Sequence, residues 1–315
     1  MSSTIKELKT EIAKHVIGHH ALVDAVLIGL LCEGHILIEG LPGLAKTTTV
    51  NTLAEATGLG FKRIQFTPDL LPSDLLGAEI YHPKDEVFVL KKGPLFTHLL
   101  LADEINRASA KVQSALLEVM QERQVTIGDT SFKVASPFMV LATQNPIDQE
   151  GTYTLPEAQL DRFMFKVMVG YNSEDEEFEI AKKAATKSFE TITQVLSHET
   201  LQAMQKEVTS LYIDDAITAH IVRLIFATRE PAKYGLPELE ALIAYGASPR
   251  ATIDMLKAVK ASAYMRGNTE VTPVDIALCI KNVLRHRIVL SYDAQVDDVD
   301  VDDIIEILLQ KIVLP

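Results

Sequence analysis

The chain has 315 residues, of which 47% are hydrophobic and 23% charged; this composition is typical of globular proteins and excludes disordered or fibrous ones. Its formal net charge of −13 argues against a surface-wide attraction to nucleic acid or anionic membranes, although a local basic groove remains possible. The two cysteines, Cys32 and Cys279, form no CxxC pair, and the first residues lack the apolar segment of a signal peptide. The cysteine usage predicts a reduced, cytoplasmic protein without a disulfide framework, and no apolar run is long enough for a membrane span.

The first 170 residues alternate between helical and strand patterns. In chain order they predict helices at 5–15 and 21–33, a strand at 35–39, a helix at 46–57, strands at 61–66 and 98–103, a helix capped by Ser109, and strands at 138–143 and 163–169. Short apolar runs bounded by glycine are typical of buried parallel strands. Strands that alternate with helices predict a three-layer αβα domain with a parallel sheet.

Two segments interrupt this alternation and are predicted to be β-hairpin inserts. Residues 80–90 and 125–134 each contain two alternating runs around a turn, and Gly128 and Asp129 stand at the second reversal.

Beyond residue 170 the pattern is almost wholly helical. Ser173 and Glu176 form a capping box, and Ser248 and Thr272 each precede a proline at a first helical position. We therefore predict an α/β domain at 1–170 and a C-terminal all-α domain at 171–315.

A glycine-rich segment between a predicted strand and a predicted helix has the pattern of a phosphate-binding loop. Glycines let the backbone N–H groups approach phosphates, a lysine reaches the outer phosphates, and a hydroxyl binds Mg²⁺. The general pattern has glycine where Ala45 stands; its methyl group is tolerated with right-handed helical dihedrals and costly at positive φ. The candidate nucleotide-binding residues are Gly40, Leu41, Pro42, Gly43, Leu44, Ala45, Lys46, Thr47 and Thr48.

Two acidic residues stand at the end of the apolar strand predicted at 98–103. In P-loop ATPases the first acid holds Mg²⁺ and the second polarises the attacking water, which predicts these roles for Asp103 and Glu104. Thr47 is the second candidate metal ligand. Because ligands bind at the carboxyl ends of parallel strands, Asp103 is expected beside Lys46.

Further motifs follow one another across nearly the whole chain: Val16–His19, Phe66–Gly77, Gly93–Phe96, Ala102–Arg107, Gln113–Met120, Ala142–Pro146, Leu155–Phe163, Gly246–Arg250 and Val283–Arg287. In this order, and together with the phosphate loop, they resemble the MoxR family of AAA+ ATPases. The version G-x-P-G-x-A-K-T, with alanine at position 45, is typical of that family.

The resemblance implies roles for several further residues. Asn145 matches the sensor 1 residue that helps to hold the attacking water, and Arg250 matches sensor 2. Arg162 matches the arginine finger that is donated to a neighbouring subunit; by itself it could equally form an ion pair with Asp161. The residues implied at the adenine pocket are Val16, Ile17 and Gly18. The hairpins match inserts that face the central pore in related rings.

The resemblance also implies a function. It predicts an ATP hydrolase that uses ATP and Mg²⁺, assembles as a hexameric ring and remodels or activates client proteins. Family members often act with a separate partner that carries a von Willebrand A domain, and they help to insert cofactors or metals into enzymes. A DNA-directed motor or loader on the same fold is the alternative, against which the acidic balance argues weakly. A small-molecule kinase fits less well, because the acid pair and the candidate finger favour hydrolysis.

Two segments resemble metal-binding motifs, but neither satisfies the pattern of such a site. His15, His19 and His20 lack the carboxylate of a zinc motif. The acidic run Asp297–Asp303 fails the calcium-loop pattern, in which glycine and glutamate would replace Asp303 and Leu309. We expect the run to form the acidic start of a helix.

Overall fold

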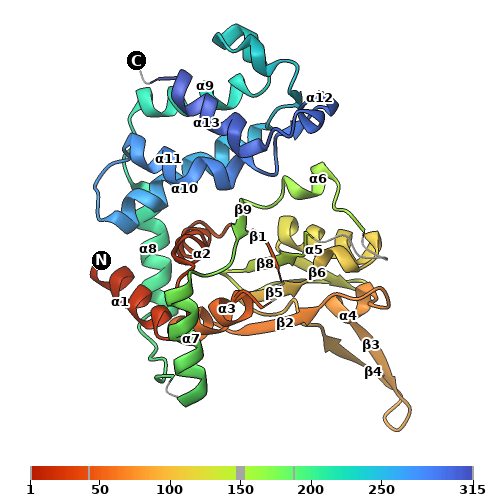
Figure 1. Ribbon diagram of the computed structural model, residues 1–315. Helices are drawn as coiled ribbons and strands as arrows, with labels where there is room; N and C mark the ends of the chain where they lie inside the picture. Colours follow the sequence, from red (N-terminus) through yellow and green to blue (C-terminus); the bar gives the residue numbers. More distant parts are fainter. Residues whose placement is uncertain (1, 42, 147–152, 187–188, 314–315) are drawn as a thin grey trace.

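The computed structural model describes residues 2–41, 43–146, 153–186 and 189–313. Five parallel strands form the central sheet in the order β2-β5-β8-β1-β9 (Figure 1). Their bounds are β2 Phe61–Gln65, β5 Leu99–Asp103, β8 Met139–Gln144, β1 Ile36–Gly40 and β9 Phe165–Val169. All five were predicted, with ends that differ by no more than two residues.

Alternate residues of the strands pack against opposite faces of the sheet, as a period of two requires. Ile36 and Ile38 of β1 belong to one apolar cluster, whereas Leu37 belongs to the other. The first cluster includes apolar residues of the helices around β1, and the second includes those of α5. The helices of this region are α1 Ser2–Ala13, α2 His20–Cys32, α3 Lys46–Thr57, α4 Pro72–Leu76, α5 Ala110–Glu122 and α6 Glu157–Leu160. The predicted three-layer αβα core is therefore confirmed.

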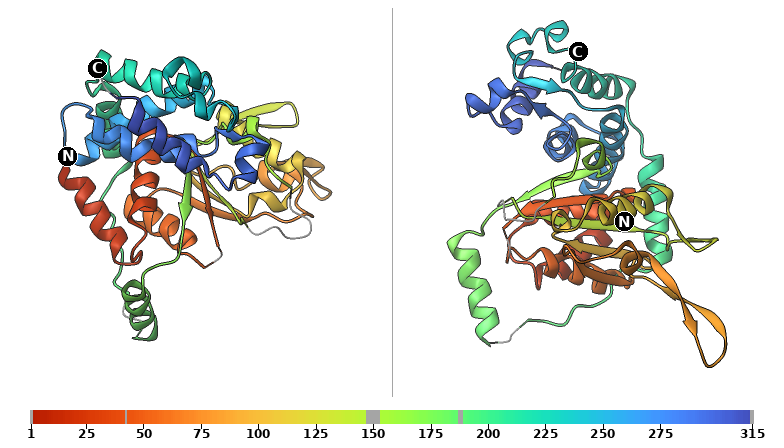
Figure 2. Two further views of the ribbon diagram at one scale, coloured as in Figure 1. Left: turned by 45° about the horizontal axis from the view of Figure 1, so that its top comes forward. Right: turned by 90° about the vertical axis from the view of Figure 1, so that its right-hand side faces the viewer.

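Both predicted hairpins are present as separate two-stranded antiparallel sheets. The first pairs β3 Gly77–His82 with β4 Val87–Lys92, and it projects well beyond the core in Figure 1 and in the right-hand view of Figure 2. The second pairs β6 Gln124–Ile127 with β7 Thr130–Lys133, and Gly128 has a positive φ of 57° at its turn.

The C-terminal region consists mainly of helices; α9 to α13 lie above the core in Figure 1, whereas α8 runs along its left side and α7 lies at the lower left. They are α7 Glu174–Thr186, α8 His198–Ser210, α9 Asp215–Ala227, α10 Pro249–Arg266, α11 Pro273–Leu284, α12 Tyr292–Val296 and α13 Val301–Lys311. The predicted caps at Ser173, Ser248 and Thr272 are present, and Asp300 with Asp303 caps α13, so the acidic run starts a helix as expected.

One feature of this region was not predicted: strands β10 Ile243–Tyr245 and β11 Val289–Leu290 form a small antiparallel sheet. Strands of two or three residues are too short for periodicity to indicate them. The division into residues 1–170 and 171–315 stays a prediction. In the described part of the chain, no helix has both the length and the apolar character needed to cross a bilayer.

Candidate functional site

The phosphate loop lies between the end of β1 and the start of α3, as the sequence predicts. Gly43 has a φ of 87°, which is readily adopted only by glycine. Ala45 immediately precedes α3 and has a φ of 53° and a ψ of 10°. This is the costly alternative for its methyl group, since a left-handed conformation costs a non-glycine residue about 1–2 kcal/mol. Pro42 lies outside the described residues.

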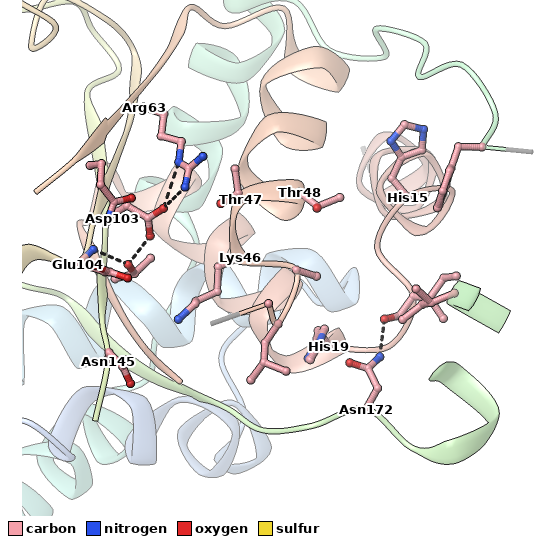
Figure 3. A pocket seen from close by; sticks show the side chains of 18 residues that line it. His15, His19, Lys46, Thr47, Thr48, Arg63, Asp103, Glu104, Asn145 and Asn172 are labelled. Carbon is pink, nitrogen blue, oxygen red and sulfur yellow. Dashed lines mark hydrogen bonds and ion pairs between the residues drawn. The ribbon is translucent and has the colours of Figure 1, made fainter. Parts of the chain in front are cut away.

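A cavity of about 600 Å³ opens at this loop (Figure 3). It is lined by residues 43–48 of the loop and by side chains from the ends of three strands. Of the residues predicted to bind the outer phosphates or the metal or to take part in catalysis, the cavity brings together Lys46, Thr47, Asp103, Glu104 and Asn145. Asp103 is thus in the same cavity as Lys46, as expected from the positions of strand ends in an open parallel sheet.

The acid pair is held by hydrogen bonds between neighbouring strands. The Asp103 carboxylate accepts from Arg63 Nη2 at 2.6 Å and from Thr143 Oγ1 at 2.6 Å. Thr143 Oγ1 in turn accepts from the backbone N–H of Glu104 at 2.9 Å. Glu104 has a φ of 54°, and its carboxylate lies 2.9 Å from Arg107 Nη1. These contacts fix the strand end from which both acids face the cavity.

Lys46 points into the same space. Its Nζ donates to the carbonyl oxygen of Gly40 at 2.6 Å. Burial lowers the pKa of Lys46, and the charges of Asp103 and Glu104 oppose that shift. The cavity therefore combines a cationic group, carboxylate oxygens and a helix N-terminus, which is the set of groups that binds the phosphates of a Mg²⁺–nucleotide.

The other end of the cavity is more apolar. Ile17 lines it, whereas Val16 is buried with 2% of its surface exposed, and Gly18 has a φ of 71°. Asn172 Nδ2 donates to the Ile17 carbonyl at 2.9 Å and closes the turn (Figure 3). Residues that sequence reasoning did not assign to the cavity also line this end: His15, His19, Ile180 and Phe189.

Phe189 contacts the ring of His15 edge-on at 5.4 Å between centroids, and His15 Nε2 lies 2.7 Å from the Glu190 carbonyl oxygen. The segment after α7 therefore packs against the segment after α1, although about 170 residues separate them. No local pattern marked Phe189 or Asn172. Arg63 was also missed, because an arginine in a short strand carries no signal until its neighbour in the sheet is known.

Two predicted catalytic residues lie elsewhere. Neither Arg162 nor Arg250 is among the described residues that line the cavity. Arg162 Nη1 donates to the Leu117 carbonyl of α5 at 2.8 Å, and Arg250 Nη1 lies 4.0 Å from Asp161 Oδ2. Asp161 pairs with Arg287 among the described residues, so the simple alternative of an Arg162–Asp161 ion pair is not what the structure contains. The roles of Arg162 and Arg250 stay predictions.

A parallel αβα core with a phosphate loop after β1 and an acid pair after β5 defines a P-loop ATPase. Comparison with known proteins agrees with this class. Residues 35–165 match the ATPase family associated with various cellular activities (AAA), and residues 239–308 match the AAA lid domain.

Relatives extend the match over the full chain. Chaperone MoxR1 of Mycobacterium tuberculosis is 46% identical over 99% of this chain and 82% of its own length. Protein MoxR of Paracoccus denitrificans is 31% identical over 88% of this chain and 86% of its own length. The crystal structure of a putative ATPase from Cytophaga hutchinsonii has a TM-score of 0.95 and 46% identity, covering 100% of this chain and 96% of that one. The chain belongs to the MoxR family of AAA+ ATPases, and its activity is the hydrolysis of ATP.

Proposed function

We propose that the protein is a Mg²⁺-dependent ATP hydrolase that works as a hexameric ring and remodels or activates client proteins. The observation that carries the proposal is the convergence of Lys46, Thr47, Asp103, Glu104 and Asn145 on one cavity. We also propose a cytoplasmic location, supported by the free thiols of Cys32 and Cys279.

The donor set of the cavity fits a magnesium ion. Thr47 and Asp103 supply a hydroxyl and a carboxylate, which are the hard oxygen ligands that Mg²⁺ prefers, and both line the cavity beside Lys46. A bound Mg²⁺ would neutralise charge on the outer phosphates. Lys46 and the backbone of the phosphate loop would orient those phosphates at the start of α3.

The remaining groups act on the water molecule. Glu104 would polarise it as a general base, and Asn145 would help to hold it in line with the terminal phosphate. The left-handed backbone of Glu104 and its contact with Arg107 keep the carboxylate at the cavity wall. Ile17 and the apolar residues beside it would surround the adenine.

A ring would complete this site. Arg162 lines a separate hollow with Gln121 and Glu122, near the end of α5, rather than the cavity of its own chain. This location supports a role toward a neighbouring subunit, where a guanidinium would stabilise the charge of the transition state. Arg250 is at the start of α10, where it lies 4.0 Å from Asp161, so a sensor 2 role on the cavity of its own chain is not formed in this arrangement.

The hairpin β3–β4 supports a client-binding role. Phe88 is 68% exposed and contacts Tyr81, and Ile80, Val87 and Val89 on the same hairpin are also exposed. Exposed apolar groups on a projecting element are typical of interaction sites. The relative in Mycobacterium tuberculosis is named a chaperone, which agrees with an action on other proteins. We propose that a separate von Willebrand A domain partner takes part and that cofactor or metal insertion is one outcome.

Mixing two inactive variants tests the ring. Lys46→Ala should lose nucleotide affinity, while Arg162→Ala should bind ATP normally and hydrolyse it poorly. When they are mixed, an intact phosphate loop of one subunit meets an intact finger of the other at roughly a quarter of the interfaces in a randomly mixed ring. Partial recovery of phosphate release supports the ring, and no recovery at concentrations where wild-type rings form would contradict it.

A further inference from the structure

The guanidinium group of Arg287, two residues beyond the Arg285 cap of α11, joins the C-terminal helices to the core through several hydrogen bonds. Only 1% of the side chain is exposed. Its Nε donates to Asp161 Oδ1 at 2.8 Å, and its Nη2 donates to Asp254 Oδ2 of α10 at 2.6 Å. Three backbone carbonyls of the core also accept from it: those of Asp161, Phe163 and Met164, at 3.2, 2.9 and 3.2 Å.

These contacts converge on the residues that flank Arg162. Two further side chains of the C-terminal region contact the same segment. His286 Nε2 lies 2.8 Å from the Phe163 carbonyl oxygen, and Ser248 Oγ donates to both oxygens of the Asp161 carboxylate. The side chain of Arg162 instead donates to Leu117 on α5. The C-terminal helices thus hold the backbone on both sides of Arg162, while α5 holds its side chain.

We propose that Arg287 is a positioning residue that fixes the direction of Arg162 and so couples the position of the C-terminal helices to hydrolysis in the adjacent subunit. The inference rests on the proposed role of Arg162 as a finger donated between subunits. A guanidinium is suited to this task, because its planar fork makes several directed hydrogen bonds at once and stays charged when buried. Any shift of α10 and α11 relative to the core changes the hydrogen bonds between Arg287 and the three carbonyls on either side of Arg162.

Arg285 provides a matched control two residues away. Its Nε and Nη2 donate to the two carboxylate oxygens of Asp302 on α13, each at 2.7 Å, so it makes a fork of the same kind. This pair joins two of the C-terminal helices and does not reach the segment that carries Arg162. Arg285→Gln removes a comparable ion pair and should leave the turnover of ATP near that of the wild type.

The test uses the assembled protein and measures ATP affinity and phosphate release separately. Arg287→Lys keeps the charge and loses the fork. We expect its ATP affinity to match the wild type and its turnover to fall about 100-fold, the usual effect of misplacing a catalytic group by about 1 Å. Because its phosphate loop is intact, mixing it with Lys46→Ala should restore activity. Mixing it with Arg162→Ala should not, since both variants lack a working finger.

Other patterns would overturn the proposal. If Arg162→Ala rescues Arg287→Lys and Lys46→Ala does not, Arg287 serves the nucleotide site of its own subunit. If Arg287→Lys turns over ATP like the wild type, Arg287 only stabilises packing. If Arg162→Ala and Lys46→Ala fail to rescue each other, the donated finger itself is wrong, which is a separate failure.

A milder substitution keeps the test valid should Arg287→Lys fold poorly. Asp254→Asn removes the charge partner on α10 and leaves Arg287 its contacts with Asp161 and Phe163. We expect a smaller loss of turnover with the same complementation pattern. Wild-type turnover in a folded Asp254→Asn protein, together with unfolding of Arg287→Lys, would assign a purely structural role to this cluster.

Discussion

A buried histidine at the amino end of strand β1 in the central sheet should make the stability of the core depend on pH. His35 directly precedes β1, the strand that leads into the loop. Its Nδ1 accepts from the backbone N–H of Val140 at 3.0 Å, so its Nε2 carries the proton that is donated to the Met120 carbonyl at 3.1 Å. Burial, together with the nearby charge of Arg123, lowers the pKa of His35 to about 3. The ring is therefore neutral in the folded protein throughout the range from pH 4 to 8.

The sign and size of the effect follow from proton linkage. Between the folded pKa of about 3 and the unfolded value of 6.5, the unfolded chain binds more protons than the folded one, so stability falls as the pH is lowered. Each pH unit is worth about 1.4 kcal/mol. From pH 7 to pH 5, His35 should account for a loss of about 2 kcal/mol.

Substitution of His35 by Gln removes the titrating group and keeps one donor and one acceptor. Urea unfolding at pH 5, 6 and 7 gives the free energy of unfolding of each variant. The wild type should lose about 2 kcal/mol more than His35→Gln across this range. Ile36→Val, a fully buried neighbour, is the control: it should lower stability by about 1 kcal/mol at every pH. Parallel pH profiles for wild type and His35→Gln would refute the reasoning.

Three further predictions concern the site and the hairpin. Ala45→Gly should raise the free energy of unfolding by up to about 1 kcal/mol, because glycine adopts the positive φ without strain; a lower unfolding midpoint would contradict this. Glu104→Gln should bind Mg·ATP normally but release phosphate about 10²–10⁴-fold more slowly, and a near wild-type rate would make Glu104 a structural acid. Phe88→Ala alone should keep the basal ATPase activity. Combined with Glu104→Gln, which is expected to hold the protein in its ATP-bound state, it should lower the amount of other protein that co-purifies. Loss of nucleotide binding in a folded Phe88 variant would argue against the client-facing location.

Most of the core and the central part of the site could be predicted from the sequence, because their signals are local. The strand at 36–40, the glycine-rich turn and the helix at 46–57 are contiguous, so periodicity and turn residues suffice to place Lys46 and Thr47. Asp103 and Glu104 follow an apolar strand, and parallel strands bring their carboxyl ends to one edge of the sheet. The two hairpins could also be predicted, because apolar and polar residues alternate on both sides of a turn.

The tertiary structure alone decided which side chains meet across those elements. Asp103 contacts Arg63 because β2 lies beside β5, an adjacency that the periodicity of either strand does not contain. Phe189 reaches the nucleotide cavity through a return of the chain after α7, and Ala45 takes a positive φ because the loop must turn into α3. Arg287 and Asp161 are 126 residues apart and meet only where α11 packs near β9. Patterns of burial determine the local structure of a segment, whereas hydrogen-bond partners depend on the packing of distant segments. For this reason the P-loop could be recognised in the sequence, whereas the hydrogen bonds of Arg287 to the residues beside Arg162 could not.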